Sequence, residues 1–148
     1  MAYKCTDSEY FFILSTENPD LAIDCEEGVT RLVLSKFDGK ENQMFKFDEQ
    51  GSIVSKPTGL VIDVDVAVQQ GRNVVLAPKN DCAGQRWCFN SKGNIELLGS
   101  GFVMDIQGSF LVDGTHLITW PPTRSMMSQL FRIVNVVPIP NTQLTLLL

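Results

Sequence analysis

The chain has 148 residues, the length of one ordinary domain, of which 44% are hydrophobic and 20% charged. This composition excludes a disordered chain and is typical of a single globular core. A formal net charge of −5 with only 12 scattered basic residues argues against a nucleic-acid-binding surface and against a basic helix on an anionic membrane. We expect one domain that neither binds nucleic acid nor inserts directly into a membrane.

The N-terminal stretch, MAYKCTDSEYFFIL, carries charges and lacks the unbroken apolar segment of a signal peptide. We therefore expect a cytoplasmic protein or one secreted without a leader. The longest apolar runs, such as LTLLL at the end of the sequence, fall far short of the roughly 20 residues that span a bilayer.

Four cysteines occur, at Cys5, Cys25, Cys82 and Cys88. The expected compartment favours free thiols, and a short bridge between Cys82 and Cys88 remains the alternative. The sequence has no CxxC pair and a single histidine, His116, so we expect no zinc site and no other metal or cofactor.

Two sequence markers recur along the chain. The first is an aspartate that follows apolar residues, in LAIDC, LVIDV and FVMDI, at Asp24, Asp63 and Asp105. The second is a glutamine two residues before an aromatic residue, at Gln43, Gln85 and Gln129. Both markers repeat with one period of about 42 residues, which indicates three internal repeats. We place them at about 10–50, 51–92 and 93–137, within a single domain that spans 1–148 and ends in an extension over 138–148.

The repeats are predicted to be β-structure. Apolar and other residues alternate in VIDVDVAV, from Val61 to Val68, with the two-residue period of a half-buried strand. Turn signals recur about every ten residues, in DEQG, NSKG, GSG and VDGT. These signals predict about four short strands in each repeat, joined by hairpins.

Three such units are too few for a propeller and favour a closed, threefold barrel capped by hairpins. The last pattern, QLFRIVNVV, is expected to pair with YFFIL near the N-terminus and close the ring. The aromatic residues of the second marker are expected to point inward in equivalent core layers, together with the residues two further on: Phe45, Trp87, Phe131, Phe47, Phe89 and Ile133.

Three Gln-x-Trp/Phe repeats, each preceded by an apolar-Asp-apolar step, resemble the ricin-type β-trefoil lectin family over residues 10–135. The resemblance implies an all-β, twelve-stranded β-trefoil with up to three shallow carbohydrate sites. In this family the aspartate grips sugar hydroxyls, an aromatic residue some fifteen positions later stacks on the sugar ring, and an asparagine before the glutamine supports the site.

Carried over to this sequence, the resemblance favours the third repeat. Trp120 follows Asp105 by fifteen residues, and Pro121 follows the tryptophan. Ser128 stands before Gln129 where the family has asparagine, which weakens the support. His116 lies near the rim of this candidate site and is either a further donor to a ligand or merely solvated.

The other two repeats match the family pattern less well. The first keeps Asp24 and the pair Asn42 and Gln43, but the stacking position aligns with Ser35, and only Phe37 nearby is aromatic. In the second repeat Asp63 and Gln85 remain. There the stacking position aligns with Ala77, and Gly84 replaces the asparagine.

The sequence contains no nucleophile-elbow or metal-binding helix motif, and His116 has no evident nucleophile partner, so we expect no enzyme. The favoured function is a lectin for galactose or N-acetylgalactosamine glycans. The alternative is a β-trefoil that binds protein, such as a protease inhibitor or a cytokine-like ligand. Because single shallow sites bind weakly, a homodimer that joins several sites is expected for useful avidity.

Overall fold

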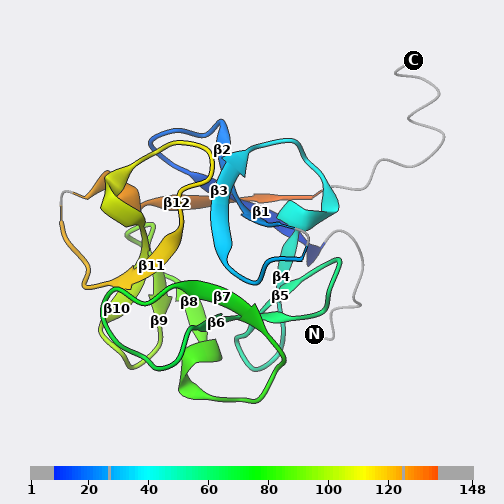
Figure 1. Cartoon of the computed structure of the whole chain (residues 1–148), viewed down its shortest axis with the longest axis vertical. Helices are drawn as coiled ribbons and strands as arrows, with labels where there is room; N and C mark the ends of the chain where they lie inside the picture. The colour runs from blue at the N-terminus through cyan, green and yellow to red at the C-terminus, as the bar shows by residue number, and fades with distance from the viewer. Residues whose placement is uncertain (1–8, 27, 125, 137–148) are drawn as a thin grey trace.

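The computed structural model describes residues 9–26, 28–124 and 126–136. The described chain is all-β, with strands in four-strand sets that follow the repeats (Figure 1). The first set is β1 (Phe11–Ser15), β2 (Leu21–Cys25), β3 (Leu32–Lys36) and β4 (Phe45–Phe47). The second is β5 (Ile53–Ser55), β6 (Val61–Val64), β7 (Val74–Ala77) and β8 (Trp87–Phe89). The third is β9 (Ile95–Leu97), β10 (Phe102–Ile106), β11 (Leu117–Trp120) and β12 (Phe131–Asn135).

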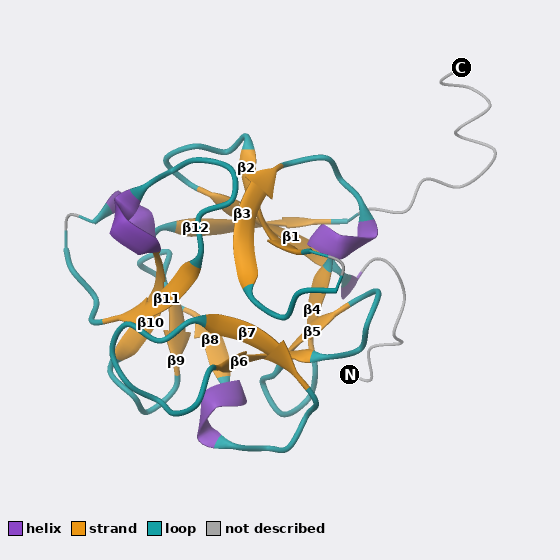
Figure 2. Cartoon of the chain, in the orientation of Figure 1, coloured by secondary structure: helices purple, strands orange, loops and turns teal. Residues whose placement is uncertain are grey.

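Single turns of 3-10 helix interrupt the loops (Figure 2). Three of them carry the motif glutamines at their last residue: η2 (Glu41–Gln43), η3 (Ala83–Gln85) and η5 (Met127–Gln129). A fourth, η4 (Gln107–Ser109), follows β10 directly. The described ranges contain no helix long and apolar enough to cross a membrane.

The barrel closes between its first and last strands. Strand β1 pairs antiparallel with β12, from Phe11 opposite Asn135 to Ser15 opposite Phe131, which confirms the predicted closing pair. Within the second and third repeats, backbone bonds link the start of the repeat to its last strand: Trp87 N–H donates to Gly51 C=O, and Phe131 N–H donates to Gly93 C=O. These pairings leave neither end of the ring as an open strand edge.

The hairpins β2–β3, β6–β7 and β10–β11 meet around the centre of the view in Figure 1, where β3, β7 and β11 lie around a common axis. Isolated bridges join each hairpin to the next: Arg31 to Val75, Asn73 to Ile118, and His116 to Val33. The threefold order therefore extends to the contacts between repeats, and each hairpin is bordered by residues of its neighbour.

The core is built from equivalent aromatic layers, as the sequence predicted. Phe45, Trp87 and Phe131 are buried, while Phe47, Phe89 and Ile133 are partly buried and pack against the same cluster. Burying such large apolar side chains contributes about 1.5 to 3 kcal/mol each.

The strand predicted over Val61–Val68 is shorter than expected. Strand β6 ends at Val64, and Val66 has a φ of 68° and is 84% exposed. Alternation of residue types does not reveal the backbone turn, and a β-branched residue seldom adopts this left-handed conformation. The chain leaves the sheet here, and only Val68 returns to pack against the core.

The described cysteines, Cys25, Cys82 and Cys88, are free thiols. The expected preference for free thiols therefore holds for these three, and the alternative bridge between Cys82 and Cys88 is not formed. Cys5 and the C-terminal extension at 138–148 lie outside the described residues.

Replacing Trp87 by phenylalanine tests the polar contact of the core indole. The indole N–H donates to the buried C=O of Ile62 at 3.1 Å, whereas phenylalanine already occupies the equivalent positions Phe45 and Phe131. We expect Trp87→Phe to lower the free energy of unfolding by about 1–3 kcal/mol in chemical denaturation, because a buried carbonyl loses its partner. The exposed neighbour Arg86, changed to lysine, is the control. An unfolding free energy equal to that of the parent protein would show that the indole N–H contributes nothing.

Candidate functional sites on the three hairpins

Each motif glutamine holds the aspartate of its own repeat. Gln43, Gln85 and Gln129 are fully buried, with 0% exposure. The amide Nε2 donates to one carboxylate oxygen of Asp24 at 3.1 Å, of Asp63 at 3.0 Å and of Asp105 at 3.1 Å, in chain order. The three repeats therefore share one buried contact between the 3-10 turn and the second strand of the repeat.

The same three amides also fix the loop that follows β3, β7 or β11. Their N–H groups donate to backbone carbonyls of Lys36, Pro78 and Pro121 at 2.9, 3.0 and 2.9 Å. Their oxygens accept backbone N–H groups of Asp38, Asn80 and Thr123 at 3.0, 2.9 and 2.8 Å. With all of these bonds made inside the protein, the glutamines position the aspartates and do not themselves face a ligand. We call this arrangement the glutamine clamp.

In the first repeat both oxygens of the aspartate have partners. Asn42 Nδ2 donates to Asp24 Oδ1 at 2.9 Å, and Gln43 occupies Oδ2. Ser35 lies opposite Ala22, two residues before the aspartate. The aromatic residue considered as a substitute, Phe37, packs edge-on against Phe12 with ring centroids 4.9 Å apart. This hairpin therefore offers no free ring beside its aspartate.

In the second repeat the aspartate turns toward its own strand. Asp63 Oδ1 accepts the backbone N–H of Val64 at 2.7 Å. A Cβ added to Gly84 would lie only 2.5 Å from this oxygen, so the carboxylate occupies the space that a side chain before Gln85 would need. Ala77 lies opposite Val61, at the position equivalent to Ser35.

The third repeat differs in the partners of its aspartate. Asp105 is 4% exposed, Gln129 binds its Oδ2, and its buried Oδ1 has no hydrogen-bond partner among the described residues. Trp120 lies opposite Val103, while Asp105 lies opposite Ile118. Since directly opposed and alternate residues share one face of a hairpin, the half-buried indole and the carboxylate are on the same face.

Ser128 does not replace the missing asparagine. The residue is buried, and its hydroxyl pairs with the hydroxyl of Ser109 at 3.3 Å, which joins η5 to η4. The serine thus holds the loop after β10 beside the site, while the free oxygen of Asp105 gains no bond from it.

His116 lies at the junction of two repeats. It is half-buried and pairs with Val33 on β3 of the first repeat, although it immediately precedes β11 of the third. Asn73 pairs with Ile118 in the same way, and Gly71 approaches Trp120, with a hypothetical Cβ 3.8 Å from the indole Cζ3. Asn73 and Gly71 border the third-repeat site from the second repeat, and sequence reasoning missed both. Superposing the starts of β3, β7 and β11 would have shown that Asn73 and His116 are equivalent.

Within the described ranges, no three His, Cys, Asp or Glu side chains gather as metal ligands would.

The sequence matches the family model described as ricin-type beta-trefoil lectin domain over residues 10–131. The chain belongs to this family of carbohydrate-binding proteins. A comparison with curated protein sequences gave no significant match.

Solved structures with the same fold include a designed protein and natural lectins. The designed threefold-symmetric protein ThreeFoil is 20% identical, with a TM-score of 0.76 over 86% of this chain and 99% of its own. The C-half of an earthworm R-type lectin, solved with GalNAc, is 22% identical, with a TM-score of 0.73 over 86% and 99%. The ricin B-like lectin of Macrolepiota procera, solved with lactose, is 15% identical, with a TM-score of 0.74 over 90% and 100%. These similarities confirm the β-trefoil expected from the sequence.

Gly84→Ala tests the crowding beside the second aspartate. The added methyl group would meet Asp63 Oδ1, which Gln85 and the Val64 N–H hold in place, so we expect a loss of about 1–3 kcal/mol in unfolding free energy. A double-mutant cycle by chemical denaturation supplies the control, because the cost of Gly84→Ala should shrink when Asp63 is also changed to alanine. Equal costs in the two backgrounds would place the strain elsewhere.

Asn42→Ser gives the first repeat the residue that the third repeat has. Asp24 Oδ1 would then lose its amide donor, and we expect the free energy of unfolding to fall by about 1–3 kcal/mol. Thermal and chemical denaturation would measure the change, with exposed Lys40→Arg as the control. If Asn42→Ser is as stable as the parent protein, the amide bond to Asp24 is not a source of stability.

Proposed function

We propose that the protein is a non-catalytic lectin that binds galactose- or N-acetylgalactosamine-type glycans at the third repeat. The observation that carries the proposal is the unpartnered Oδ1 of Asp105 on the hairpin face that also presents Trp120. A buried carboxylate oxygen without a partner is costly, and a sugar hydroxyl is a donor that supplies the missing bond.

The chemistry of this face suits a sugar ring. A hydroxyl bound to an ionised carboxylate makes a charge-assisted hydrogen bond, stronger than a neutral one. The indole offers an apolar surface to the C–H side of the ring. Because the glutamine clamp fixes Asp105 Oδ2, one defined oxygen is left for a ligand and little orientational freedom is lost on binding; Oδ1 is buried, so the groups that cover it must move aside for a hydroxyl to reach it.

The choice of sugar rests on the relatives. The earthworm lectin half was solved with GalNAc and the Macrolepiota procera lectin with lactose, a galactoside. Both share the fold of this chain, and on this support we propose the same sugar class. The first and second repeats are weaker candidates, because their aspartates have both oxygens engaged and Ser35 and Ala77 provide no ring.

We propose binding without catalysis. Beside Asp105 and Trp120, the paired positions on this face are the apolar residues Val103 and Ile118, and neither supplies a nucleophile or a second carboxylate. A single weak site gives little avidity, so we also propose that two chains associate to present their third-repeat sites together.

A protein-binding role is the second candidate, favoured by one observation. The loop after β10 and the adjacent η5 expose three apolar side chains: Phe110 at 66%, Val112 at 58% and Met127 at 47%. Large exposed apolar side chains gathered on one loop region mark interaction surfaces more often than scattered ones do.

Trp120→Ala tests the lectin proposal. We expect the dissociation constant for galactose or N-acetylgalactosamine, measured by calorimetry or by NMR titration, to rise by about tenfold or more, because the stacking surface is lost. The fold should remain intact, since the indole is half-buried and outside the central core cluster.

The matched control is Ala77→Ser, at the equivalent position of the second repeat, which should leave sugar affinity unchanged. Unchanged affinity in Trp120→Ala would move the site away from this hairpin. If the protein binds no glycan on a panel, or if millimolar galactose and N-acetylgalactosamine both fail to inhibit that binding, the protein-binding candidate is favoured instead.

A further inference from the structure

We infer that the protein has a second, separate binding site: a cavity between the first and second repeats that takes a small, uncharged, mostly apolar molecule. The cavity measures about 650 Å³, within the range of about 300–1,000 Å³ typical of small-molecule pockets. Asn42 of the weaker first-repeat candidate lines it, but Asp24, Ser35 and the third-repeat residues do not, so the cavity is distinct from the sugar site proposed at the third repeat.

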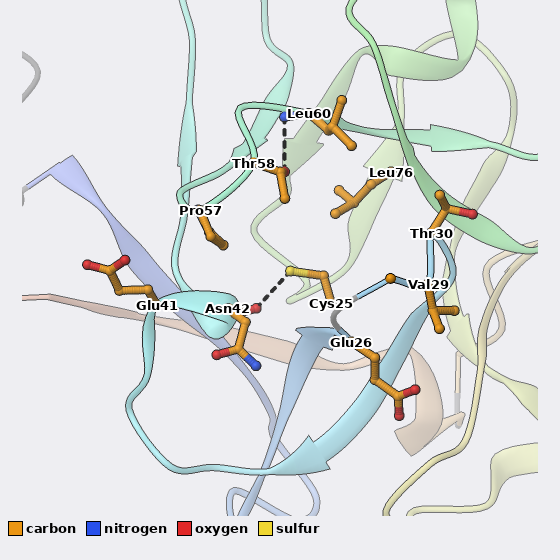
Figure 3. A pocket seen from close by; sticks show the side chains of 11 residues that line it. Cys25, Glu26, Val29, Thr30, Glu41, Asn42, Pro57, Thr58, Leu60 and Leu76 are labelled. Carbon is orange, nitrogen blue, oxygen red and sulfur yellow. Dashed lines mark hydrogen bonds between the residues drawn. The ribbon is translucent and has the colours of Figure 1, made fainter.

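Side chains from both repeats form the walls (Figure 3). Leu60 and Leu76 come from the second repeat and Cys25 from the end of β2, and in Figure 3 the Cys25 thiol lies near the centre of the cavity. The carboxylates of Glu26 and Glu41 point away from this centre. An occupant therefore meets apolar groups and a thiol inside, and acidic groups only at the rim.

Differences between the repeats account for the open space. Cys25 follows its aspartate directly, and the equivalent residues of the other repeats are Val64 and Ile106, both also buried in the core cluster. On the facing repeat, Leu60 stands where the third repeat has Phe102. Cysteine and leucine are the smaller members of these sets, and the core leaves a space where the smaller side chains meet.

Two of the polar groups at the walls already have partners, which limits what the cavity can recognise. The Cys25 thiol donates to the C=O of Asn42 at 3.1 Å, and Thr58 Oγ1 accepts the N–H of Leu60 at 3.1 Å. Burial raises the pKa of the Cys25 thiol above its ordinary value, so the sulfur stays protonated and neutral at neutral pH.

Charge completes the description of the ligand. The rim carries Glu26 and Glu41, of which Glu41 pairs with Lys56 at 3.3 Å, and the chain as a whole has a net charge of −5. Carboxylate, sulfate and phosphate groups are therefore disfavoured. An aromatic ring or short alkyl body with at most one neutral polar group fits the volume, the walls and the charge.

The test uses benzyl alcohol as the probe and benzoate, the same ring with a carboxylate, as its matched comparison. In NMR titrations of the full chain, we expect saturable shifts of the methyl groups of Leu60, Leu76 and Val29 with millimolar benzyl alcohol, and an affinity for benzoate weaker by several fold. Shifts that do not saturate, or that fall on other methyl groups, would overturn the inference.

Cys25→Ile fills the cavity with the residue that the third repeat has at this position, so we expect the fold to persist and the affinity for benzyl alcohol to drop at least about tenfold. Leu76→Phe fills it from the facing wall and decides the outcome if Cys25→Ile does not fold. An unchanged affinity in a folded variant contradicts the proposed site.

A readout on the unmodified protein completes the test. Benzyl alcohol should slow alkylation of Cys25 by iodoacetamide, followed by peptide mass spectrometry, while exposed Cys82 reacts at the same rate with or without the probe. Equal slowing or no slowing at the two cysteines would contradict binding beside Cys25. None of these measurements involves a sugar, so the cavity and the lectin proposal fail or hold separately.

Discussion

In each of the three repeats, the fully buried side-chain amide of a glutamine links the second strand to the loop that follows the third strand. The amide N–H groups of each glutamine donate to an aspartate and to a backbone carbonyl, and its amide oxygen accepts a backbone N–H from the loop, as Gln43 shows. Removing such a group would leave several buried polar atoms without partners, which costs far more than the net value of one hydrogen bond. The hairpins, and whatever they bind, therefore depend on this contact for their position.

The glutamine clamp holds one carboxylate oxygen of each aspartate in place. The residue before the glutamine determines what surrounds the second oxygen. Asn42 donates to it in the first repeat, Gly84 leaves room for it to bind its own strand in the second, and Ser128 bonds elsewhere in the third. A single position thus gives the three aspartates different surroundings on one framework. Among the residues that the structure describes, only the third repeat combines an unpaired oxygen with an indole on the same face.

Much of this arrangement was predictable from the sequence, because a pattern that occurs three times is less ambiguous than a single local match. The period of the repeats predicted the barrel, the closing pair of β1 with β12 and the core layer around Trp87. The alignment of Ser35, Ala77 and Trp120 is borne out by strand register, since each lies opposite the residue two before its aspartate.

Other features lay outside what a linear pattern encodes. The turn at Val66 depends on a backbone angle, and alternation of residue types is blind to it. The neighbours of His116 and Asn73 come from bridges between repeats, which a repeat-by-repeat alignment does not contain. The cavity at Cys25 reflects side-chain volume that is missing, and missing volume becomes visible only when facing repeats are packed together.

The central claim is that the clamp directs the free oxygen of Asp105 toward a ligand beside Trp120. A crystal structure of the protein with bound galactose tests this claim most directly. The account predicts a sugar hydroxyl within hydrogen-bond distance of Asp105 Oδ1, the ring against the indole, and the bond from Gln129 to Oδ2 retained. Galactose bound at another hairpin, with Asp105 Oδ1 still lacking a partner, would contradict it.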